Sequence, residues 1–161
     1  MPRTIRFDKT QEELQFENTC RPYRDVEAAE SGELTRETTI EPLRAGRADV
    51  LIGQPEGSWL DVKRAHYDLD TQHGKISIAQ AVARFANAEH GGIVVVGMRG
   101  KKIPSGELIH SICPVPLDGR TLRRYQSALE HHLYPPPNLL DIEEFSHGSG
   151  QWIVFLHIPP Q

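Results

Sequence analysis

Gly91-Gly92-Ile93-Val94-Val95-Val96-Gly97 is the stretch of sequence that decides the fold. Its four central residues are all β-branched and lie between glycines, which is typical of a strand buried on both faces. The preceding segment, residues 76–86, repeats apolar side chains at helical spacing, and the glycine pair that follows is a helix stop. The sequence therefore predicts a helix followed directly by the central strand of a sheet.

Further elements are predicted on both sides of this unit. Residues 59–64 alternate apolar and charged side chains, as a half-buried strand does. Residues 117–134 have helical spacing and run into Pro135-Pro136-Pro137, which cannot continue a helix. Residues 139–145 and 152–158 flank a Ser- and Gly-rich turn and predict a hairpin. We therefore expect an α+β fold, in which helices pack on a mixed β-sheet.

This pattern predicts one domain, residues 49–161, preceded by a flanking acidic and polar region, residues 1–48. Apolar side chains are sparse in the flanking region. Over residues 31–47 we expect a solvated helix or linker, with Pro42 limiting the length of any helix. Exposed turns are predicted at Gly100-Lys101-Lys102 and at Pro104-Ser105-Gly106.

Composition narrows the possible functions. The chain has 161 residues and 38% hydrophobic content, enough for one ordinary core. Its net charge is -4, with a sequence pI near 6.0, which is the wrong sign for coating nucleic acid by bulk electrostatics. Any binding to nucleic acid must therefore use a local basic patch.

The compartment is predicted from what the sequence lacks. No apolar stretch is long enough for a bilayer span, and residues 1–9 lack the apolar core of a signal peptide. Cys20 and Cys113 lie far apart in the sequence and in no metal-ligand or redox spacing, so we expect reduced thiols. These observations predict a cytoplasmic protein with no membrane partner.

Three motifs, in order, carry a resemblance to a known family. They are Glu56-Gly57-Ser58-Trp59-Leu60-Asp61-Val62-Lys63, then Phe85-Ala86-Asn87 with Gly91-Gly92 close behind, and then Val94-Val95-Val96-Gly97. Together they resemble the Schlafen-type Alba-like DNA-binding domain, over roughly residues 49–160. The resemblance implies a sandwich of helices on a mixed sheet and a nucleic-acid-binding function, as part of a regulator or a defence-type protein.

The same resemblance bears on catalysis. Members with nuclease activity hold divalent metal with three acidic residues, of which two correspond to Glu56 and Asp61, while the third position is Arg99. Carboxylates suit Mg²⁺ or Mn²⁺, whereas a guanidinium cannot ligate a metal and instead pairs with carboxylates. Glu56 and Asp61 are thus candidate catalytic residues only in an alternative hypothesis, a metal-dependent endoribonuclease, with Asp141 or Glu143 as substitutes for the third ligand. Otherwise they are solvent-facing or are partners of Lys63 and Arg99.

The leading interpretation is a nucleic-acid-binding module without catalysis, metal or cofactor, for which DNA or RNA is the partner. The candidate contacts are basic side chains after the acidic strand and in the Gly-rich turn after the central strand: Lys63, Arg64, Arg99, Lys101 and Lys102. The alternative is that the two lysines of the turn only solvate a hairpin tip. A homodimer and a protein-interaction domain are further options that the sequence leaves open.

Overall fold

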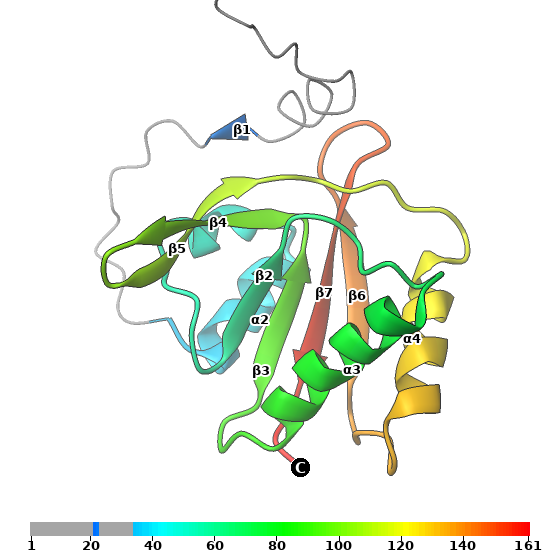
Figure 1. Ribbon diagram of the computed structural model, residues 1–161. Helices are drawn as coiled ribbons and strands as arrows, with labels where there is room; N and C mark the ends of the chain where they lie inside the picture. Colours follow the sequence, from blue (N-terminus) through cyan, green and yellow to red (C-terminus); the bar gives the residue numbers. More distant parts are fainter. Residues whose placement is uncertain (1–20, 23–33) are drawn as a thin grey trace, which may run out of the picture.

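The computed structural model describes residues 21–22 and 34–161, and it contains two β-sheets with helices packed on them (Figure 1). The main sheet has four strands in the order β2 (Leu60–Lys63), β3 (Gly92–Val96), β7 (Trp152–Ile158) and β6 (Asp141–Ser146). The strands β2 and β3 are parallel, and the other neighbours are antiparallel. The predicted α+β fold with a mixed sheet is confirmed.

The predicted central strand is correct. All five residues of β3 are buried, and their side chains alternate between two hydrophobic cores. Val94 and Val96 face the core beneath helices α3 (Gln72–Ala86) and α4 (Thr121–His132), which cover one face of the main sheet in Figure 1. Ile93 and Val95 face the second core, on the opposite side of the sheet.

The second core contains elements that precede residue 49. Helix α2 (Arg36–Arg44) starts at Thr35, whose hydroxyl oxygen accepts from the Thr38 N–H, and a 3₁₀ helix follows at Ala48–Leu51. Ile40 is only 8% exposed and Leu43 is fully buried against the sheet. The expectation of a solvated segment over residues 31–47 is therefore wrong for α2, because two apolar residues at i and i+3 give a short helix a buried face.

A hairpin that the sequence analysis did not predict covers the same face. It consists of β4 (Met98–Ile103) and β5 (Gly106–Ile112), and with β1 (Arg21–Pro22) it forms a small sheet in the order β1-β5-β4. The turn predicted at Gly100-Lys101-Lys102 is wrong, since these residues lie inside β4. A Cβ added to Gly100 would lie 2.7 Å from Glu107 Oε1. The glycine therefore leaves room in the strand for the Glu107 side chain.

Two expectations about the compartment can be compared with the structure. Among the described residues, no helix is long and apolar enough to cross a membrane. Cys113 is disulfide-bonded, so the expectation of a reduced thiol there is wrong, and Cys20 lies outside the described residues. Separation in sequence does not limit approach in space, and the argument for a reducing compartment loses its basis.

Candidate nucleic-acid interface

Three of the predicted basic residues lie together on strand β4. We call Arg99, Lys101 and Lys102 the hairpin cations; all three side chains are exposed. Among the strands of the described residues, β4 pairs with β5 and forms an edge of the small sheet. Within the described part of the chain, none of the three takes part in an ion pair. No carboxylate of the described residues therefore compensates their charges.

The other two predicted basic residues lie at the end of β2. The side chain of Lys63 is 42% exposed, and its Nζ lies 3.3 Å from Asp61 Oδ1. Arg64 is half-buried and interacts within the protein. Lys63 therefore remains accessible to a partner, whereas Arg64 has a role inside the fold.

Asp61 is held by two cations. Leu60 and Val62 are buried in the second core, so the alternation of the strand turns Asp61 and Lys63 toward α3. There Arg84 Nη2 reaches Asp61 Oδ2 at 3.4 Å, and the Asp61 side chain is only 15% exposed. The sequence-based alternative of an ion pair at Asp61 was right for Lys63, but the second cation is Arg84 and not Arg99.

Glu56 closes the outer edge of β2. Its Oε1 accepts a hydrogen bond from the Val62 N–H at 2.6 Å, which satisfies a donor that no neighbouring strand reaches. Burial raises the pKa of Glu56, and the nearby carboxylates of Asp61 and Glu107 raise it further, against the lowering effect of the Val62 hydrogen bond. The sequence analysis missed Glu107 because it missed the hairpin that carries it.

These carboxylates do not fit a divalent metal. Glu56 binds backbone at the edge of β2, whereas both oxygens of Asp61 face cations on the α3 side. The proposed substitutes Asp141 and Glu143 lie on β6, at the opposite edge of the main sheet, and pair with Arg44. Among the described residues, no group of three or more His, Cys, Asp or Glu side chains could hold a metal ion. We therefore derive no metal-dependent step.

A polar groove lies between β2 and α3. It has a volume of about 490 Å³, and we call it the β2–α3 groove; it is lined by Asp61, Lys63, Tyr67, Ser77, Gln80, Ala81 and Arg84. The Tyr67 ring packs edge-on against Tyr125, at 6.4 Å between ring centroids. Its hydroxyl is buried and has no hydrogen-bond partner among the described residues. Burial raises the pKa of Tyr67 and the charge of Asp61 adds to this, so the hydroxyl keeps its proton.

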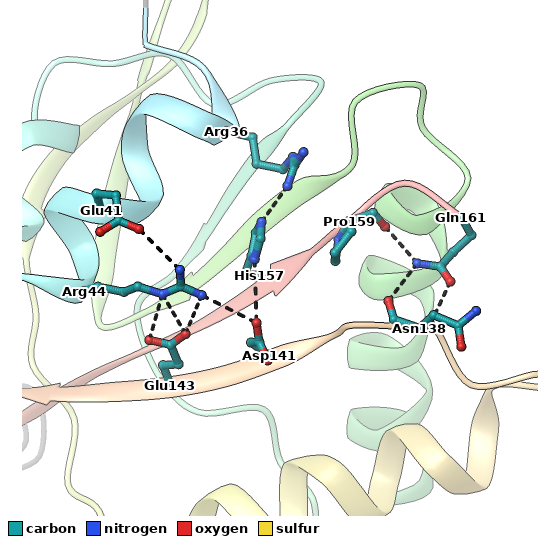
Figure 2. Close-up of polar contacts among 9 residues, drawn as sticks. All are labelled: Arg36, Glu41, Arg44, Asn138, Asp141, Glu143, His157, Pro159 and Gln161. Atoms are coloured by element: carbon teal, nitrogen blue, oxygen red, sulfur yellow. Dashed lines mark hydrogen bonds and ion pairs between the residues drawn. The ribbon is translucent and has the colours of Figure 1, made fainter.

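A second polar cluster joins α2 to strands β6 and β7 (Figure 2). Arg44 Nε donates to Glu143 Oε1 at 3.0 Å, and the Arg44 guanidinium also reaches Asp141 at 3.5 Å and Glu41 at 3.4 Å. These carboxylates surround the guanidinium on several sides. The cluster fixes the helix to the sheet edge.

His157 lies at the centre of this cluster. Arg36 Nη1 donates to His157 Nε2 at 2.5 Å, and because a guanidinium cannot accept, Nε2 must carry the lone pair. The proton is then on Nδ1, 4.0 Å from Asp141 Oδ2. Burial lowers the pKa of His157, as do the charges of Arg36 and Arg44, while Asp141 and Glu143 oppose them. A neutral imidazole is the form that fits this site.

Comparisons of the chain with protein-family models, with curated proteins and with solved structures find no significant match.

Proposed function

We propose that this chain is a nucleic-acid-binding module that contacts the DNA or RNA backbone through the hairpin cations, without catalysis. The observation that carries the proposal is that Arg99, Lys101 and Lys102 are exposed on one strand and have no ion pair within the described residues. The resemblance of the sequence to the Schlafen-type Alba-like domain supports the same function.

The physical reason lies in the exchange of counterions. A cation without an internal partner has no ion pair to break when a phosphate approaches, and each phosphate contact releases ions that were condensed on the nucleic acid. Most other basic side chains of the structure are less available, as Arg44 and Arg36 are already bound to carboxylates. The net charge of -4 therefore does not prevent binding at this local patch.

The test is fluorescence anisotropy with short single- and double-stranded DNA and RNA, from ~50 to ~200 mM salt. We expect affinity to fall with salt, and Lys101→Glu/Lys102→Glu to weaken binding by about tenfold or more, because two attractive contacts become repulsive. The matched control is Arg120→Glu/Arg123→Glu, which makes the same change in net charge at two exposed residues, the N-cap and the first turn of α4.

If both double variants weaken binding equally, net charge and not the hairpin governs the interaction. Absence of binding at low salt would overturn the proposal and favour the protein-interaction alternative. The nuclease alternative predicts cleavage on gels with Mn²⁺ that Glu56→Gln abolishes, whereas we expect no cleavage by the wild-type protein.

The homodimer and the cytoplasmic location stay predictions. The disulfide at Cys113 weighs against the second, because such bonds persist mainly in oxidising compartments.

A further inference from the structure

We infer that the β2–α3 groove binds one nucleotide of a single-stranded nucleic acid, with the phosphate at Lys63 and Arg84 and the base edge at Asp61. The inference rests on the proposed function and goes beyond it by naming a second contact zone and the strandedness of the ligand. Four features of the groove support it: the hydrogen-bond donors, the excess of positive charge, the unpartnered hydroxyl and the position next to β4.

The groove is a concentration of hydrogen-bond donors. Ser77, Gln80 and Arg84 follow one another at spacings of three and four residues, so they share one face of α3. Lys63 adds an ammonium from β2, and Tyr67 adds a hydroxyl from the connecting segment. Asp61 is the one lining side chain that, when ionised, only accepts. Such a set suits a ligand with a charged acceptor and at least one donor.

The charges of the groove leave an excess of one positive charge. Asp61 holds Lys63 and Arg84 side by side at 3.3 and 3.4 Å, while the two cationic side chains remain 42% and 60% exposed. Ion pairs this exposed contribute little to stability and rearrange easily. Both cations can therefore contact a phosphate from their exposed sides while they stay beside Asp61, whose side chain is only 15% exposed and needs them as partners.

The hydroxyl group of Tyr67 lacks a hydrogen-bond partner in the part of the chain that the structure describes, and a bound ligand could supply one. Buried hydroxyl groups normally make a hydrogen bond, and this one has none among the described residues, although it belongs to a side chain that lines the groove. The phenol keeps its proton, so a rotation of the Tyr67 side chain that brings this buried hydroxyl to the groove surface would let it donate to an oxygen of the ligand. A phosphate or sugar oxygen would satisfy it.

Size and position favour a nucleotide within a longer strand. A volume of about 490 Å³ lies within the range of small-ligand sites, roughly 300 to 1,000 Å³. The Gly97 N–H donates to the Lys63 carbonyl at 2.7 Å, and β4 starts at the next residue, Met98. The groove thus ends where the strand with the hairpin cations begins. An unpaired base can enter the groove with its whole Watson–Crick edge, whereas a paired base shows its amino group only at the floor of the major groove, which favours single strands.

The test compares groove variants with matched controls in the same anisotropy assay. We expect Arg84→Gln to weaken binding to a single-stranded dC oligomer by about tenfold, from the loss of a charge-assisted contact, and to leave duplex binding within about twofold. Lys75→Gln makes the same charge change on α3 outside the groove, and should alter neither.

Tyr67→Phe removes only the unpartnered hydroxyl, so it should fold normally and yet weaken single-strand binding. A dT oligomer lacks the exocyclic amino group of cytosine and should bind more weakly than dC. If Arg84→Gln and Tyr67→Phe bind single strands as well as wild type, while Lys101→Glu/Lys102→Glu does not, the groove inference fails and the proposed function stands. If wild type binds no oligomer, both fail.

Discussion

The α2 side of the main sheet and strand β4 use basic residues in opposite ways. Around His157, the Arg36 guanidinium contacts the imidazole and the Arg44 guanidinium contacts carboxylates (Figure 2). Arg36 also donates to the Glu37 carboxylate and to the His90 backbone carbonyl. On β4, the three hairpin cations have no ion pair within the described chain. Charges that are satisfied internally hold the fold together, whereas charges that are balanced only by solvent ions are available to a partner.

Among the variants that test this comparison, we expect the largest loss of stability from Leu43, the buried apolar residue of the helix that carries the paired arginines. Leu43→Ala removes a fully buried side chain of α2, so the free energy of unfolding should fall by about 2–5 kcal/mol. Urea unfolding measures this, with the exposed Arg47→Ala as the control. A loss below about 1 kcal/mol would mean that the polar cluster, and not burial, holds α2 on the sheet.

An intermediate effect is expected from His157. Because its pKa is lowered in the folded protein, the unfolded chain binds more protons as the pH falls below about 6.5. This residue should therefore reduce stability as the pH falls from about 6.5 through its lowered folded pKa, and have no such effect above that range. His157→Gln keeps an acceptor for Arg36 but does not titrate. Thermal unfolding across this range should be less pH-dependent in the variant; equal pH dependence would exclude His157 as the cause.

The smallest effect should come from Arg44→Gln. The Arg44 and Glu143 side chains are 37% and 32% exposed, so the pair is screened by solvent and should contribute only a small free energy of unfolding, which decreases at high salt. Urea unfolding at two salt concentrations gives this value. Arg99→Gln, which has no ion pair to lose within the described residues, should leave stability unchanged. If both variants changed the free energy of unfolding by the same amount, the paired charges would contribute no more to stability than the unpaired ones.

Local patterns in the sequence predicted most of the regular structure. The central strand, the helices α3 and α4 and the final hairpin each have their own periodicity, and each was correct. The β4–β5 hairpin was missed because Gly100 and two lysines look like a turn. That glycine leaves room for the Glu107 side chain, which lies on the neighbouring strand and cannot be predicted from a local window of sequence.

In the candidate site, too, local features could be predicted from the sequence, whereas contacts between distant residues could not. Exposure of Lys101 and Lys102 was predictable, since consecutive lysines rarely enter a core. The partnership of Asp61 with Arg84 was not, because it depends on how α3 crosses β2, and the two residues are 23 positions apart in sequence. The disulfide at Cys113 could not be predicted either, because the spacing of cysteines in the sequence does not show which of them are close in the folded protein.

Gly97 separates β3 from β4, and its conformation fixes the distance between the β2–α3 groove and the hairpin cations. Its φ is +113°, and an added Cβ would lie 2.7 Å from Ile153 Cδ1, so an alanine would not fit. Its N–H donates to the Lys63 carbonyl and its carbonyl accepts from the Cys113 N–H, both at 2.7 Å. With both backbone groups bonded, this joint does not act as a hinge. The groove and the hairpin cations would then work as a molecular ruler: affinity would rise in a step once an oligonucleotide is long enough to reach from one to the other.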